Sequence, residues 1–138
     1  MRRTLMVSLL LVAGCASPAW TDSGYHQQVV TTAEAAASSV DLVRLVVENE
    51  ARLTRPYLQT VLTEAVTALG SVDSQFSAVQ PPTRAAVSAR AELTALTGEA
   101  ADQVQTLLNE VRLGGVENPA QAAGDLRELS DELRAAAE

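Results

Sequence analysis

The chain has 138 residues, of which 47% are hydrophobic and only 3% are aromatic. A chain of this length forms one ordinary domain, with a core made mainly of Leu, Val and Ala. Its 10 basic and 17 acidic residues give a net charge of −7. An acidic chain repels phosphate backbones and anionic lipid headgroups, which argues against nucleic-acid binding and electrostatic membrane adhesion.

The first residues have the pattern of a secretory signal. Arg2 and Arg3 form a short positive segment, and residues 5–12 are an apolar run with a single Ser. The run is too short to span a bilayer, which needs about 20 apolar residues, but it has the length of the apolar region of a signal peptide. The Arg pair leaves both the general secretory route and the twin-arginine route open, and the general route is favoured.

Directly after this run stands Val12-Ala13-Gly14-Cys15. It resembles the lipobox of bacterial lipoproteins, in which Leu is commoner at the position of Val12. The resemblance implies cleavage between Gly14 and Cys15, and lipidation of the Cys15 thiol, which would anchor the mature chain in the membrane at its extracytoplasmic face. Cys15 is also the only Cys, so an internal disulfide is excluded. The alternatives are an ordinary secretory signal with an incidental Cys, or an uncleaved anchor.

Small, turn-forming residues dominate residues 16–24 and predict a tether. Such a segment reaches at most about 30 Å when extended, so the following domain would stay near the membrane. Trp20 is the only Trp, and two interpretations of it remain open. Its indole ring could lie among lipid headgroups, or it could cover the end of the following domain.

Helical periodicity dominates the remainder of the chain. Apolar residues recur at steps of three and four over residues 25–53, 56–79, 84–113 and 119–136. Short connections with capping or helix-stopping residues separate these segments, namely Thr54-Arg55-Pro56, Pro81-Pro82-Thr83, Gly114-Gly115 and Asn118-Pro119. Because short connections make successive helices antiparallel neighbours, we expect an all-α fold: an up-down-up-down four-helix bundle preceded by a signal-peptide helix.

The expected organisation is therefore a signal peptide (1–14), a lipidated Cys with its tether (15–24) and a helical bundle (25–138). In the first helix, an apolar stripe runs from Val29 to Ala51. The residues expected to be buried against other helices are Leu62, Val72, Leu93, Leu107 and Leu129. We also expect i,i+4 ion pairs from Arg44 to Glu48 and from Glu48 to Arg52 on the exposed face of the first helix.

No residues have the pattern of a catalytic, cofactor or metal site. His26 is the only His and is interpreted as a solvated side chain, while Ser38 and Ser39 have no His close in sequence. The Glu-x-x-His motif of di-iron bundles and the C-x-x-C-H motif of haem attachment are both missing from the sequence.

The carboxylate groups Glu48 with Glu50, and Glu128 with Asp131 and Glu132, are spaced as solvated helix faces. Glu117 and Asn118 alone provide too few oxygens for a Ca²⁺ site. We therefore expect no enzyme activity, no cofactor and no metal. The role of the domain would then depend on its surface or on a ligand between its helices.

Two functions remain: a helical interaction or structural module that presents an acidic face to a protein partner, and a bundle that encloses a small apolar ligand. Stripes of Ala such as Ala33, Ala36, Ala65 and Ala100 let helices approach closely and leave little cavity, which favours the first. By composition alone, the chain resembles small, Ala-rich, Lys-free helical lipoproteins of high-GC bacteria. That resemblance implies location and anchoring only.

Overall fold

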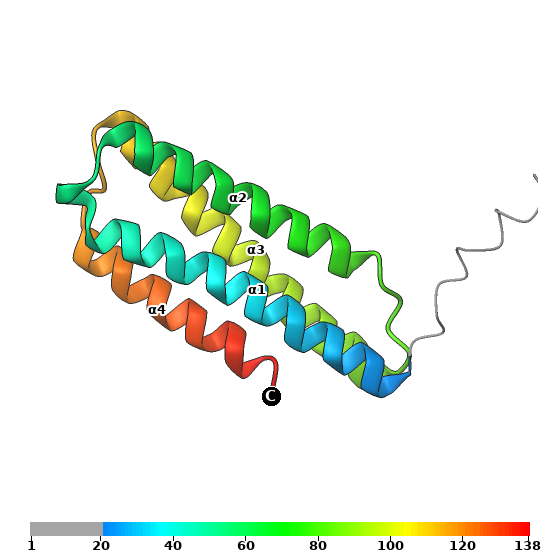
Figure 1. Ribbon diagram of the computed structural model, residues 1–138. Coiled ribbons are helices and arrows are strands. Elements are labelled where there is room, and N and C mark those ends of the chain that lie inside the picture. The colour runs from blue at the N-terminus through cyan, green and yellow to red at the C-terminus, as the bar shows by residue number, and fades with distance from the viewer. Residues whose placement is uncertain (1–20) are drawn as a thin grey trace, which may run out of the picture.

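A computed structural model describes residues 21–138, which form an all-α bundle (Figure 1). Successive helices run in opposite directions, so the expected up-down-up-down four-helix bundle is confirmed. The helices are α1 (Asp22–Glu48), α2 (Arg55–Ser77), α3 (Arg84–Leu113) and α4 (Pro119–Ala135), with the short 3-10 helix η1 (Glu50–Arg52) between α1 and α2. The expected signal peptide, the cleavage site at Gly14, Cys15 and Trp20 lie outside the described residues.

Local capping sets where the helices begin. The Thr83 hydroxyl accepts a hydrogen bond from the Ala86 N–H at 3.2 Å and begins α3 as expected. The Thr21 hydroxyl likewise accepts from the Gly24 N–H at 3.2 Å. Because Thr21 is the cap, α1 begins at Asp22, and the last residues of the expected tether are helical.

The helix α1 packs against all three other helices, and its most extensive contacts are with α4. The stripe of Ala33, Ala36 and Ala37 on α1 is fully buried, and these short side chains let the neighbouring helices approach closely. The helices α2 and α3 form the second closely packed pair, whereas α3 and α4 touch less extensively. Side chains of both helices line a groove at the α3–α4 boundary.

Most of the predicted core is confirmed, since Leu62, Leu93, Leu107 and Leu129 are buried. Two positions were predicted wrongly. Val72 is only half-buried on α2, and Ala51 is exposed because α1 ends at Glu48 and the chain turns away through η1. The apolar period of the sequence continues past the point where the helix ends.

The helices differ in length, and α4 has 17 residues against 27 in α1. In Figure 1, α4 ends well before the end of the bundle where α1 begins. The fourth corner of the bundle is therefore incomplete at that end.

Candidate functional site

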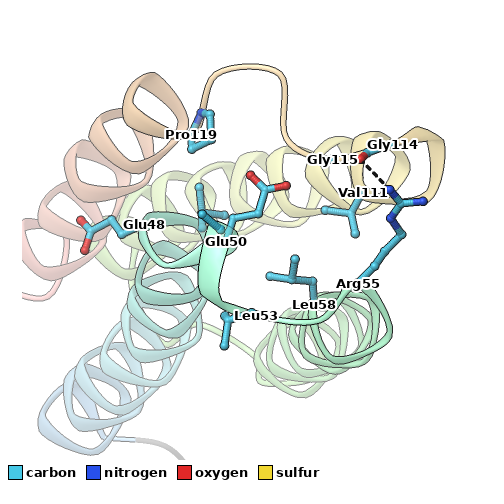
Figure 2. Close-up of a pocket in the computed structure, with 11 residues that line it drawn as sticks. Glu48, Glu50, Leu53, Arg55, Leu58, Val111, Gly114, Gly115 and Pro119 are labelled. Carbon is cyan, nitrogen blue, oxygen red and sulfur yellow. Dashed lines mark hydrogen bonds between the residues drawn. The ribbon is translucent and has the colours of Figure 1, made fainter.

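An open cleft of about 440 Å³ lies at the end of the bundle where the α1–α2 and α3–α4 connections meet (Figure 2). Its apolar lining includes Val47, Leu58 and Val111, which are buried core residues of three different helices. Its polar rim includes Glu50 and Arg55 from the α1–α2 connection and the start of α2. We call it the loop-end cleft.

The two charged residues of the rim hold the α3–α4 connection in place. A carboxylate oxygen of Glu50, Oε1, accepts a hydrogen bond from the Val116 N–H at 2.8 Å. Arg55 donates from Nη2 to the Gly114 carbonyl at 2.9 Å. Gly115 has a φ of 143°, and a Cβ at this position would lie 2.9 Å from Glu50 Oε1, so the contact requires glycine. The rim charges of this cleft are therefore already used in holding the fold.

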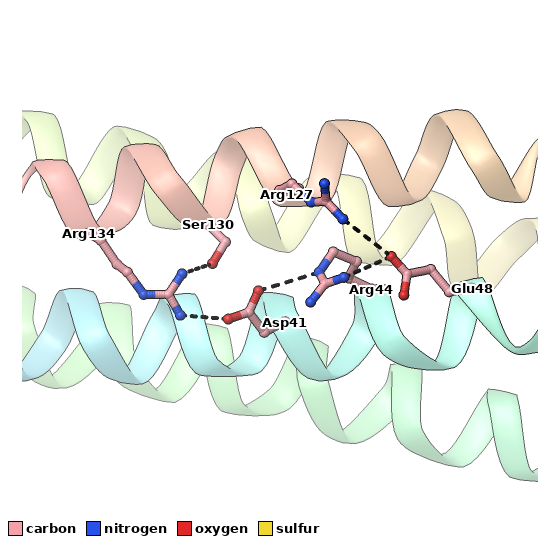
Figure 3. Close-up of polar contacts among 6 residues, drawn as sticks. All are labelled: Asp41, Arg44, Glu48, Arg127, Ser130 and Arg134. Carbon is pink, nitrogen blue, oxygen red and sulfur yellow. Dashed lines mark hydrogen bonds and ion pairs between the residues drawn. The ribbon is translucent and has the colours of Figure 1, made fainter.

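A second polar feature, the α1–α4 ion network, crosses the interface between those helices (Figure 3). Arg134 donates from Nη2 to Asp41 Oδ2 at 2.5 Å and from Nη1 to the buried Ser130 hydroxyl at 2.6 Å. Arg44 Nε lies 3.6 Å from Asp41 Oδ1. Burial alone would raise the pKa of Asp41, but the hydrogen bond from Arg134 and the charges of Arg134 and Arg44 lower it below 3.8.

The network extends to Glu48 at the end of α1. Arg44 Nη1 lies 2.7 Å from Glu48 Oε1, which confirms the predicted i,i+4 pair. The predicted Glu48–Arg52 pair is wrong, because α1 ends at Glu48 and Arg52 belongs to η1. Glu48 instead lies 4.0 Å from the exposed Arg127 of α4.

Carboxylates line the groove between α3 and α4, which has a volume of about 550 Å³. Its acidic side chains are Glu99, Asp102, Asp125, Glu128 and Glu132. The remaining lining residues are Gln103, Thr106 and Leu129, so no Arg borders the groove. This acidic groove is the part of the described surface that best fits the expected acidic helical face.

The other residues singled out in the sequence lie apart from one another. His26 is exposed on the first turns of α1, and Asp131 is exposed on α4. The Ser39 hydroxyl donates to the Ala35 carbonyl at 3.1 Å and is used within its own helix. Asn118 caps α4 by accepting from the Gln121 N–H at 3.2 Å. These positions therefore have individual structural roles.

Sequence reasoning missed Asp41, Ser130 and Arg134. The i,i+4 spacing of Ser130 and Arg134 was a usable signal for their contact. The contact of Arg134 with Asp41 joins residues 93 positions apart, and no local pattern predicts which carboxylate of another helix lies opposite an Arg.

Between residues 21 and 138, no group of three or more His, Cys, Asp or Glu side chains is arranged to hold a metal ion. No helix in that range combines the length and apolar character needed to cross a membrane. No family model, curated protein or solved structure matches this chain.

Proposed function

We propose that this chain is a lipoprotein of the bacterial cell envelope whose bundle acts as a non-enzymatic interaction or structural module. The observation that carries the proposal is Val12-Ala13-Gly14-Cys15, which follows a short apolar run and precedes a helical domain that begins at Asp22. Cleavage before Cys15 and lipidation of its thiol would attach the domain to the extracytoplasmic face of the membrane.

The length of the tether keeps the start of the bundle close to the membrane. Residues 16–21 reach at most about 20 Å when extended, so the end of the bundle at Asp22 stays next to the membrane. The helix α1 has 27 residues and is about 40 Å long at 1.5 Å per residue. The loop-end cleft lies at the other end of α1 and would face away from the membrane when α1 stands upright on it.

The charge of the domain supports a protein partner with a basic surface. Removal of Arg2 and Arg3 would leave 8 Arg against 17 acidic residues, a net charge of 8 − 17 = −9. The acidic groove concentrates this charge along α3 and α4, and no Arg is among the residues that line it. Complementary charge steers association and sets specificity more than it sets affinity.

A small apolar ligand between the helices is the alternative. The clefts at both ends of the bundle and the acidic groove are open at the surface and include charged side chains in their linings, whereas sites for apolar ligands are enclosed and mainly apolar. The interaction module is therefore the better-supported function.

Membrane attachment is tested by Cys15→Ala in the full chain, with Ser17→Ala as the matched control. We expect Cys15→Ala to abolish incorporation of labelled fatty acid and to leave an unprocessed precursor or a protein released from the membrane fraction. Ser17→Ala should be processed normally. A Cys15→Ala protein that is correctly processed and retained at the membrane would contradict the proposal.

The role of the acidic groove is tested by charge reversal. Glu128→Lys in the groove is compared with Glu64→Lys, which makes the same charge change at an exposed site on α2. We expect proteins that co-purify with the lipidated chain to be lost with Glu128→Lys and at high salt, and to be kept with Glu64→Lys. Equal retention by both variants would exclude the groove as the contact surface.

A further inference from the structure

A second cleft, of about 360 Å³, lies at the opposite end of the bundle from the loop-end cleft. Tyr25 and Val29 of α1 line it together with Ala86 and Ala89 of α3, and Ala136 closes it from the end of α4. It exists because α4 stops at Ala135, before it can cover the first turns of α1. We call it the α1-start cleft.

The lining of the α1-start cleft is mainly small apolar side chains, and the polar side chains Asp22, His26, Thr83 and Glu138 lie among them. Tyr25 and Val29 are only 2% and 3% exposed, so the floor of the cleft is part of the core. A volume of about 360 Å³ is at the lower end of the range for sites that hold a small organic group. The volume and the apolar part of the lining fit an occupant the size of one large side chain with an apolar body.

We propose that Trp20 occupies the α1-start cleft. Thr21 is the N-cap of α1, so Trp20 is the residue before the cap, and Tyr25 is the fourth residue of the helix. An apolar residue before the cap commonly packs against the fourth helical residue, in the contact known as the hydrophobic staple. Tyr25, the residue that Trp20 would contact in a hydrophobic staple, is therefore one of the residues that line the cleft.

The backbone at the cap is compatible with this contact. Thr21 has φ −80° and ψ 159°, an extended conformation that fixes the direction in which the chain enters α1. Trp20 is joined to this residue and lies two positions before Asp22, which borders the cleft, so its side chain needs no long linker to reach it. An indole ring there takes the place that another turn of α4 would fill.

This contact would shorten the free tether to residues 16–19, which reach at most about 14 Å. A segment of only four residues would then join the lipid to the start of α1, where Trp20 is held. The angle of α1 to the membrane would be restricted as a result. In the other interpretation, Trp20 lies in the lipid headgroup layer. The free tether would then be longer, and the bundle could tilt more freely relative to the membrane.

Fluorescence tests the proposal directly, because Trp20 is the only Trp in the chain. The full chain is measured in buffer with acrylamide, and on vesicles of phosphatidylethanolamine and phosphatidylglycerol that carry brominated acyl chains. We expect an emission maximum at shorter wavelength than in guanidinium, with weak quenching by acrylamide and by the brominated lipid.

Two matched variants on α3 locate the indole. Ala89→Arg places a charged side chain in the cleft, whereas Ala91→Arg makes the same change at an exposed neighbouring position. Ala89→Arg should move the emission to longer wavelength and increase acrylamide quenching, with helicity unchanged by circular dichroism, and Ala91→Arg should change neither. Ala136→Arg, at the end of α4, makes the same test if Ala89→Arg fails to fold.

Two results would overturn the proposal. One is an emission maximum of the folded chain at the same wavelength as that of the chain unfolded in guanidinium, which would mean that Trp20 is in water. The other is strong quenching by the brominated lipid, which would place Trp20 in the membrane. Neither result depends on the identity of a protein partner, and the acrylamide measurement in buffer does not depend on lipidation of Cys15.

Discussion

Arg134 on α4 donates a hydrogen bond to Asp41 on α1, with 2.5 Å between Nη2 and Oδ2. The same guanidinium also binds the Ser130 hydroxyl at 2.6 Å, so one side chain joins two turns of α4 to the middle of α1. The helices α1 and α4 are the first and last helices of the described chain, and this pair is a polar contact between them.

Removal of this pair should cost little at neutral pH, because both side chains are partly exposed. Asp41→Ala and Arg134→Ala should each lower the free energy of unfolding by up to about 1 kcal/mol, and the double variant should show that the two effects are coupled. Arg127→Ala is the control, since Arg127 lies 4.0 Å from Glu48 and is 68% exposed. Additive effects of the two substitutions would show that the pair contributes nothing.

The Asp41–Arg134 pair should also make the free energy of unfolding depend on pH in the acidic range. The folded state lowers the pKa of Asp41 below 3.8, so the folded protein binds fewer protons than the unfolded chain when pH falls through this range. The stabilisation is fully present above about pH 4 and is lost as pH falls through the lower folded-state pKa. Denaturant unfolding at a series of pH values should show a smaller acid loss for Asp41→Asn than for the natural chain.

Glu50→Ala should destabilise the loop end of the bundle. The substitution leaves the partly buried Val116 N–H without its carboxylate acceptor, which costs about 1–3 kcal/mol. Glu64→Ala, at an exposed position on α2, removes the same charge without a bond to the α3–α4 connection. Hydrogen exchange should be faster at Val116 in Glu50→Ala only, and unchanged exchange there would refute the role of Glu50.

Leu107→Ala tests the register of α3. Leu107 is 4% exposed, whereas Leu113 on the same helix is 89% exposed. Loss of the Leu107 side chain should cost about 2–5 kcal/mol in free energy of unfolding, since it leaves a cavity in the core. Leu113→Ala should change this quantity by less than about 0.5 kcal/mol. Similar values for the two variants would mean that α3 buries a different face from the one described.

Tyr25→Phe should leave stability unchanged or raise it by up to about 1 kcal/mol, because the buried Tyr25 hydroxyl has no hydrogen-bond partner among the described residues. Burial raises the pKa of Tyr25 above 10.0, although the charge of Arg90 opposes the shift. The natural chain should therefore lose stability as pH rises above about 10, and Tyr25→Phe should lose less. Tyr57→Phe, at a half-exposed site, is the control in the same denaturant titration.

Local interactions determined which residues form helices, where α3 and α4 begin and where α3 ends, although the end of α1 was predicted too late. A cap such as Thr83 or Asn118 bonds to an N–H three residues ahead, and Gly114 and Gly115 end α3 through bonds to the Glu110 carbonyl. All of these contacts lie within five residues, so the sequence alone contains them. The predicted lipid site at Cys15 is also a local motif, which is why it needs no fold to be proposed.

Only the tertiary structure decided which helix faces are covered. Leu42 and Leu45 are about half exposed on α1 because no neighbouring helix lies over them, while the polar Thr97 is buried and satisfied by the Leu93 carbonyl at 2.8 Å. The Asp41–Arg134 contact and the α1-start cleft likewise depend on the lengths and positions of helices far apart in sequence. Helical periodicity shows which residues share a face, but burial is set by how far the neighbouring helices extend along it.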